Sequence, residues 1–232
     1  MTKVPSLGIL MLDTQFPRPL GDLGNPESYP VPVIRAVAPG AWPDKVVQSQ
    51  AGLRQARLVD VFAGLARQLQ RDGALAITTS CGFLVLLQQE LQAAVDVPVE
   101  TSSLLQLPGL LAQQPQVGVL TISASRLGDE HLRCAGVPRG RLRDVLVEGV
   151  DAQGEFASAI LGNRSRMDLA RAQADVLAAA LRLRARAPGL RTVVLECTNM
   201  PPYAAAITAA TGLRTVSLLQ SRRLFQPFEA KP

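Results

Sequence analysis

Two segments of the chain, one in each half, share a single pattern: an apolar run, then a cysteine, then a helical pattern. In the first half the run 74–77 precedes Cys81, and in the second half the run 192–195 precedes Cys197. A short apolar run between turn signals is typical of a strand buried on both faces of a parallel sheet. The repeat therefore predicts a chain built from two similar halves.

Strand and helix patterns alternate along the rest of the chain, which indicates an α/β protein with parallel sheets. The predicted halves are residues 1–113 and 114–232, and the last strand is free to cross back to the first half. Pro43 is expected to block an early helix. The predicted strands are 7–12, 31–38, 74–81, 97–99, 117–122, 144–150, 192–195 and 214–219, and the predicted helices are 50–71, 84–94, 103–114, 129–135, 168–187 and 204–210.

Polar or reactive side chains follow several of these strands. Asp13, Cys81, Ser123 and Cys197 each lie at the carboxyl end of a predicted strand, which is where α/β sheets bind their ligands. Two domains that face each other would bring these ends around one cleft, so we predict the active site there. A loop rich in Pro and Gly, residues 16–30, follows the first strand, and its length predicts a functional role such as a cover for the site.

Composition narrows the classes of partner. Aromatic residues make up 4% of the 232 residues, which argues against a stacking surface for single-stranded nucleic acid. The basic residues behind the net charge of +5 are spread along the chain, and the densest set lies in and around one helical segment, which indicates a solvated helix face. Three cysteines, an odd number, indicate a reducing compartment. The first apolar run is too short to span a membrane, so we expect a cytoplasmic protein with no nucleic-acid or membrane partner.

The two cysteines are candidates for acid–base chemistry. A single free cysteine is often only a small buried hydrophobe, but matching positions in two halves favour a catalytic role for Cys81 and Cys197. A nearby helix N-terminus is expected to lower a thiol pKa. If one cysteine is a thiolate and the other a thiol, one removes a proton from a carbon and the other returns one to the opposite face. The N–H groups after each cysteine could hold a substrate carboxylate.

Metal and nucleotide chemistry are not expected. His131 is the only histidine, and although His131 and Cys134 have ligand spacing, a full zinc site would also need Cys81 and Cys197. We therefore predict no metal, and we interpret Cys134 as a filler residue. The chain has no glycine-rich phosphate-binding motif, so no nucleotide cofactor is expected either.

Both cysteine segments resemble motifs of the aspartate/glutamate racemase superfamily. Residues 195–201, Leu-Glu-Cys-Thr-Asn-Met-Pro, resemble its second motif, often Leu-Gly-Cys-Thr-His-Phe-Pro, and residues 79–81 resemble its first, usually Ala-Cys-Asn-Thr. Asp13 and Thr14 are similar to its Asp-Ser pair. The resemblance implies two pseudosymmetric flavodoxin-like domains with the active site in the cleft between them, catalysis without a cofactor, a small carboxylate substrate and a homodimer.

The motifs also depart from that pattern. Gly82 and Phe83 stand where the superfamily has Asn-Thr, and Asn199 stands where it has His. Phe83 is expected to narrow the pocket or make it more apolar. The superfamily also contains hydantoin racemases, maleate cis–trans isomerases and arylmalonate decarboxylases, and the presence of both cysteines argues against a decarboxylase.

The first hypothesis is thus an isomerase: a cofactor-independent racemase or epimerase of an amino acid or related carboxylate, with Cys81 and Cys197 as the two bases. A maleate-type isomerase or a lyase of small dicarboxylates, using the same cysteines, is the alternative. A non-catalytic protein that binds small carboxylates is a third possibility, motivated by the altered motifs. The residues expected to bind the substrate are Asp13, Thr14, Ser80, Gly82, Phe83, Ser123, Ser125, Thr198 and Asn199.

Overall fold

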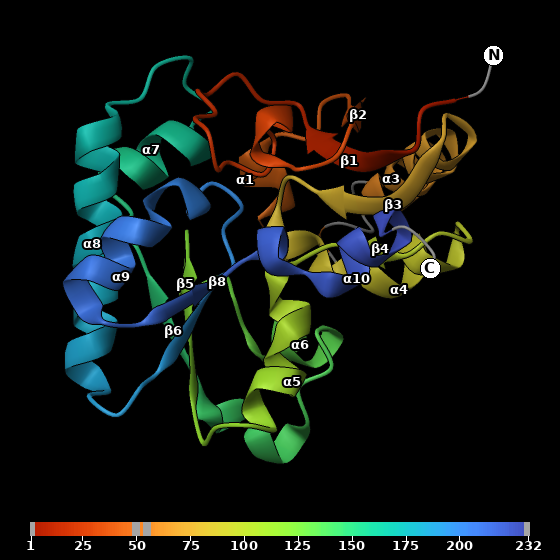
Figure 1. Ribbon diagram of the computed structural model, residues 1–232. Coiled ribbons are helices and arrows are strands. Elements are labelled where there is room, and N and C mark those ends of the chain that lie inside the picture. The colour runs from red at the N-terminus through yellow and green to blue at the C-terminus, as the bar shows by residue number, and fades with distance from the viewer. Residues whose placement is uncertain (1–2, 48–51, 53–56, 230–232) are drawn as a thin grey trace.

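Each half of the chain contributes one four-stranded parallel sheet (Figure 1). The computed structural model describes residues 3–47, 52 and 57–229. The first sheet has the order β2-β1-β3-β4 and the second the order β6-β5-β7-β8. The strands are β1 (Ser6–Leu12), β2 (Val33–Ala38), β3 (Ala74–Thr79), β4 (Val99–Glu100), β5 (Val117–Thr121), β6 (Val145–Gly149), β7 (Thr192–Leu195) and β8 (Arg214–Val216).

The two sheets have the same topology: in each, the first strand of the half lies between the second and the third. This confirms the α/β class and the two pseudosymmetric parallel sheets. All the residues of β1 and β5 are buried, as their unbroken apolar sequences require. β8 pairs with β7, so the expectation that the last strand could cross back to the first half is wrong. The helix after it, α10 (Arg222–Phe225), packs against β3 and β4 instead.

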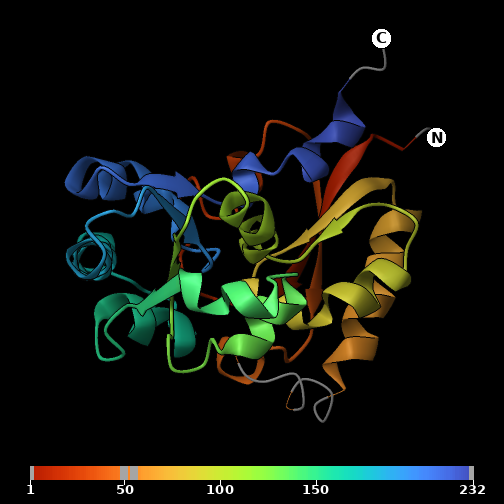
Figure 2. The ribbon, with the colours of Figure 1, turned by 90° about the horizontal axis from the view of Figure 1, so that it is seen from below.

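The long helices of the two halves, α3 (Leu58–Arg71) and α8 (Leu169–Arg186), lie on opposite sides of the molecule (Figure 2). In the first half α3 (Leu58–Arg71) packs on β1, β2 and β3 through Leu58, Phe62, Ala66 and Leu69, which recur at helical spacing. The part of the predicted helix 50–71 that includes residues 50, 51 and 53–56 lies outside the described residues. The proposed boundary after residue 113 falls between α5 (Leu107–Leu111) and β5, and it stays a prediction.

In the second half, α8 (Leu169–Arg186) begins at Asp168, whose side chain accepts hydrogen bonds from the N–H groups of Ala170 and Arg171. Sequence reasoning missed α7 (Glu155–Leu161), because this helix is short and starts after a glycine with no side-chain cap. Pro43 does not block a helix; it is the first residue of α1 (Pro43–Val46), a position where a missing N–H costs nothing.

The remaining helices are mostly short. The α-helices are α4 (Gln88–Ala93), α6 (Asp129–Cys134) and α9 (Ala204–Thr211), and the 3-10 helices are η1 (Pro26–Ser28), η2 (Gly82–Leu87), η3 (Ser103–Gln106), η4 (Arg139–Asp144), η5 (Pro201–Tyr203), η6 (Leu218–Gln220) and η7 (Gln226–Phe228). The predicted helix 84–94 is therefore split into η2 and α4. Ser102 caps η3, since its side chain accepts the N–H of Leu104. Within the described ranges, every helix falls short of the length and apolar character that a membrane crossing requires.

Candidate active site

The loop that follows β1 reaches across to the second half of the molecule. The N–H of Leu23 donates to the carbonyl of Thr198 at 3.1 Å. The Asn163 side chain donates to the carbonyl of Asp13 at 3.1 Å and accepts the N–H of Gln15 at 2.7 Å. The loop 16–30 thus lies against the second cysteine motif.

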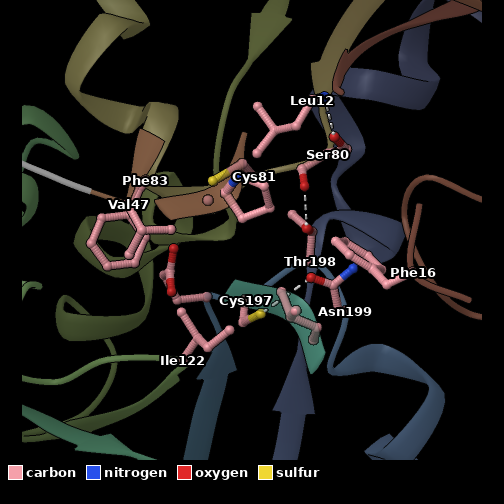
Figure 3. Close-up of a pocket in the computed structure, with 14 residues that line it drawn as sticks. Leu12, Phe16, Val47, Ser80, Cys81, Phe83, Ile122, Cys197, Thr198 and Asn199 are labelled. Carbon is pink, nitrogen blue, oxygen red and sulfur yellow. Dashed lines mark hydrogen bonds between the residues drawn. The ribbon is translucent and has the colours of Figure 1, made fainter. Parts of the chain in front are cut away.

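A narrow pocket, partly open to solvent, lies where the two halves meet. Residues at the carboxyl ends of β1, β3, β5 and β7 line it. Parallel sheets bind their ligands at these ends, so the pocket lies where the ligand-binding edges of the two sheets meet. Figure 3 shows the arrangement. The lining residues are Leu12, Phe16, Pro43, Val47, Ser80, Cys81, Gly82, Phe83, Ile122, Ile160, Glu196, Cys197, Thr198 and Asn199.

The structure brings Cys81 and Cys197 to this one pocket, on walls that belong to different halves (Figure 3). Both are free thiols and both are buried, with 7% and 6% of their surface exposed. The Cys197 thiol donates to Oδ1 of Asn199 at 3.5 Å. A small molecule in the pocket would therefore have one sulfur on each side.

Both thiols have raised pKa values. Burial raises the pKa of Cys81 to about 12, and the neighbouring Glu196 contributes to the rise. Burial raises the pKa of Cys197 well above its ordinary value, again with Glu196 contributing. The expectation of lowered thiol pKa values is wrong, because the N–H groups of short 3-10 turns do not offset desolvation next to a carboxyl group. Both cysteines are therefore neutral thiols at neutral pH.

A buried polar network supports Asn199. Its Nδ2 donates to Oδ2 of Asp22 at 2.7 Å, and Oδ1 of Asp22 accepts Nη1 of Arg18 at 2.7 Å. The Arg18 guanidinium lies 4.5 Å from the centre of the Phe16 ring and donates to Thr14 at 2.9 Å. Sequence reasoning missed Asp22 and Arg18; two opposite charges four residues apart in a loop of Pro and Gly were the available signal.

Two of the predicted substrate-binding hydroxyls are used within the protein. Thr198 donates its hydroxyl to the carbonyl of Ser80 at 2.6 Å, and Ser80 Oγ accepts the N–H of Leu12 at 3.0 Å (Figure 3). These bonds tie β1 and the two cysteine motifs together, so Ser80 and Thr198 line the pocket while they hold its walls in place.

Four of the predicted substrate-binding residues do not line the pocket. Asp13 and Thr14 line a more open hollow beside it, and the carboxylate of Asp13 accepts the N–H of Gly40. Ser123 and Ser125 hydrogen-bond each other at 3.2 Å. In their place the end of β5 contributes Ile122.

Glu196 is an acidic residue of the pocket lining that was not among the predicted site residues. It is 1% exposed; its Oε2 accepts the hydroxyl of Thr121 at 2.7 Å, and its Oε1 has no partner among the described residues. Burial raises its pKa to about 8. A Cβ placed on Gly82 would lie 2.3 Å from Oε1, so the glycine makes room for this carboxyl group. Two differences from the superfamily motifs were the available signal in the sequence. Glu196 stands where the second motif has Gly, and Gly82 stands where the first motif has Asn.

The rest of the pocket wall is apolar, with Phe16 and Phe83 as its aromatic members. Behind the wall, His131 packs edge-on against Phe83 at 4.9 Å between ring centres, so it is a packed residue and not part of the pocket. Cys134 is half-buried in α6 and also lies outside the pocket. The part of the chain that the structure describes contains no cluster of His, Cys, Asp and Glu that could hold a metal ion.

Curated relatives cover almost all of this chain. A dimethylsulfoniopropionate lyase from Durusdinium sp. clade D is 28% identical over 96% of this chain and 74% of its own length. Dimethylsulfoniopropionate lyase 7 from Emiliania huxleyi (strain CCMP1516) is 29% identical over 95% of this chain and 66% of its own length. The chain thus spans two thirds to three quarters of these relatives. No protein-family model matches it.

Solved structures show the same fold at low sequence identity. A glutamate racemase isoform from Bacillus anthracis aligns with 98% of this chain and 82% of its own, with a TM-score of 0.61 and 16% identity. Unliganded arylmalonate decarboxylase aligns with 96% of this chain and 90% of its own, with a TM-score of 0.57 and 16% identity. The resemblance carried by the sequence motifs is therefore confirmed at the level of the fold.

Proposed function

We propose that this chain, which has the fold of the aspartate/glutamate racemase superfamily, is a lyase that removes a proton from carbon α of a small carboxylate and releases a group from carbon β. The observation that carries the proposal is the pair of buried thiols on facing walls of one pocket. The names of its curated relatives direct attention to dimethylsulfoniopropionate, a propionate with a dimethylsulfonium group on carbon β.

The reaction needs one base and no added reagent. A thiolate takes the proton from carbon α, and the electron pair of that C–H bond forms the C=C bond. The bond between carbon β and the sulfonium sulfur breaks, and its electron pair leaves with sulfur. The products are neutral dimethyl sulfide and acrylate, and the proton remains on the cysteine until it is released to solvent.

The raised thiol pKa values fit a substrate that carries a positive charge. Cys81 and Cys197 are neutral because they are desolvated. A sulfonium group a few ångströms away favours the charged form of a thiol, since opposite charges at that distance lower an acid's pKa. Binding of the substrate would then lead one thiol to release its proton to solvent, and the resulting thiolate is the base that removes the α-proton.

The apolar lining also fits such a substrate. The rings of Phe16 and Phe83 offer faces or edges to the methyl groups of a sulfonium ion, which aromatic rings bind through their quadrupole. A pocket wall of this kind keeps water away from the carbanion-like transition state. The two aromatic residues would thus contribute to binding, and neither would take part in proton transfer.

Racemisation or epimerisation is the second candidate, and the two thiols on opposite walls are the observation that favours it. One thiol would remove the α-proton and the other would return one to the opposite face. For an amino acid, however, the pocket must also hold an ammonium group. Asp13 and Ser123, which were expected to help bind the substrate, lie outside it.

The test is to incubate the purified chain with dimethylsulfoniopropionate and to measure dimethyl sulfide in the headspace and acrylate by proton NMR. We expect equal amounts of the two products, and the loss of both in Cys81→Ala and Cys197→Ala if each thiol contributes. A Cys134→Ala variant is the matched control, because Cys134 lies outside the pocket.

The same samples in D2O separate the alternatives. If no dimethyl sulfide forms but α-protons of an amino acid, a hydantoin or a dicarboxylate exchange with solvent, the lyase proposal is wrong and the racemase proposal gains support. If a ligand raises the melting temperature without any turnover or exchange, the chain is a binding protein.

A further inference from the structure

One carboxyl group in the pocket has hydrogen-bonding capacity that the protein leaves unused. Glu196 directly precedes Cys197, and its Oε1 lies against Gly82, which directly follows Cys81. The group therefore sits beside both cysteine loops. Oε2 is held by Thr121 at 2.7 Å, whereas Oε1 meets no partner among the described residues. A buried polar atom without a partner is rare in a native fold and calls for a role.

The pocket has little else with which to bind a carboxylate. Among the described residues that line it, none is basic. The hydroxyl of Thr198 is donated to Ser80, and the Asn199 side chain bonds Asp22 and accepts from Cys197. Any substrate of the proposed reaction must nevertheless place its carboxylate next to the thiols. Among the buried side-chain oxygens and nitrogens that line the pocket, Oε1 of Glu196 is the atom without a hydrogen-bond partner in the described residues.

We propose that Glu196 acts as a neutral carboxylic acid that donates a hydrogen bond from Oε1 to the carboxylate of the substrate. This proposal rests on the proposed carbon-acid chemistry and deepens it. When the α-proton leaves, negative charge moves onto the substrate carboxylate, and a positioned O–H donor in a dry pocket stabilises it. Glu196 thereby becomes a catalytic residue beside the two cysteines.

The protonation state follows from the surroundings of the carboxyl group. Desolvation raises the pKa of Glu196 to about 8, and the bond from Thr121 only partly opposes that rise. The titratable groups that face it are Cys81 and Cys197, both neutral thiols. Further out, Asp22 pairs with Arg18 beyond Asn199, and His131 lies behind Phe83. The acid is thus protonated at neutral pH and ionises as the pH rises through about 8.

The test uses binding and needs no turnover. Propionate is an unreactive carboxylate with the carbon skeleton of the proposed substrate, and its Kd for the whole chain is measured by calorimetry across neutral and alkaline pH. For the wild-type chain we expect Kd to rise about tenfold per pH unit above the pKa of Glu196, as a single ionisation requires.

Two variants assign this pH dependence. In Glu196→Gln the amide still donates but cannot ionise, so Kd should stay near the wild-type value at neutral pH and should not change with pH. In Glu196→Ala the donor is lost, and Kd should rise about tenfold or more. Glu100→Gln is the matched control: Glu100 is also buried with a raised pKa, but it bonds Ser221 and lies outside the pocket. Thermal unfolding shows that each variant is folded.

Each contrary result overturns the proposal. It is wrong if Glu196→Gln keeps the wild-type pH dependence, if propionate binds more tightly at high pH, or if the wild-type chain binds no propionate at any pH. The lyase proposal fails separately. A chain that binds propionate through Glu196 but releases no dimethyl sulfide contradicts the reaction and leaves this role intact. If the chain releases dimethyl sulfide but binds propionate independently of pH, the role of Glu196 is contradicted and the lyase proposal stands.

Discussion

Gly82 and Glu196 fill one space between them: a Cβ on Gly82 would lie 2.3 Å from Oε1 of Glu196 and 2.2 Å from its main-chain oxygen. The two residues come from different halves and each adjoins a cysteine of the pocket. The position of the buried carboxyl group therefore depends on the absence of a side chain across the cleft.

Gly82→Ala should destabilise the fold by about 1–3 kcal/mol, the usual cost of inserting a methyl group where no space exists. The free energy of unfolding in urea is the measurement. Gly64→Ala is the control, since a Cβ on Gly64 meets nothing within 4 Å and α3 should gain about 0.5–1 kcal/mol. Equal stability of Gly82→Ala and the wild type would show that the cleft is wider than described.

Asp22→Ala should cost about 3 kcal/mol, because it leaves Arg18 and Asn199 without a buried partner. Glu148→Ala removes an ion pair with Arg182 and Arg186, whose side chains are about half exposed, and should cost less than about 1 kcal/mol. Urea unfolding of both variants compares the two costs. If they are similar, the network beneath Asn199 does not stabilise the fold as its burial indicates.

Glu196→Gln should change how stability depends on pH. The folded pKa of Glu196, about 8, is above its ordinary value, so the unfolded chain loses this proton first. Its contribution to stability is complete below the ordinary pKa and is lost as the pH rises through about 8. As the pH rises from the ordinary pKa of a glutamate to about 8, the free energy of unfolding of the variant should rise relative to that of the wild type by up to about 1.4 kcal/mol per pH unit. Urea unfolding at the two ends of the window checks this, and a constant difference contradicts it.

The two pocket thiols should react slowly with iodoacetamide at neutral pH, because burial keeps them protonated. Cys134, which is less buried, should be labelled first. Above the pKa of Glu196, replacing it with Gln removes a negative charge that raises both thiol pKa values, so labelling of Cys81 and Cys197 should become faster. Mass spectrometry of the peptides distinguishes the three sites. Rapid labelling of Cys81 at neutral pH would contradict the described burial.

Local sequence was enough to predict the strands and the cysteine positions. The unbroken apolar runs of β1 and β5 predict buried central strands. A residue that directly follows a buried strand, such as Cys81 or Cys197, lies at the carboxyl edge of its sheet. That reasoning also brought Ser80, Phe83 and Asn199 to the pocket.

Long-range contacts account for what the sequence could not show. Asp13 and Ser123 also follow strands, but the direction of a side chain beyond a strand end depends on the neighbouring loop, and both lie outside the pocket. The pairing of Asp22 with Asn199 joins the two halves, which no local pattern encodes. The thiol pKa values were mispredicted because burial raises both of them, and Glu196, which is across the cleft from Cys81 and next to Cys197 in the chain, raises them further.

Thr198 is the residue at which three segments meet: its hydroxyl bonds Ser80, its carbonyl bonds Leu23, and its neighbour is Cys197. The spacing between the two cysteine segments is thus held by hydrogen bonds of Thr198 and Ser80. Outer helices such as α8 can accumulate substitutions, shift or lengthen during evolution while that spacing is retained. The fold can in this way change the chemistry of its pocket wall, residue by residue, around a fixed pair of thiols.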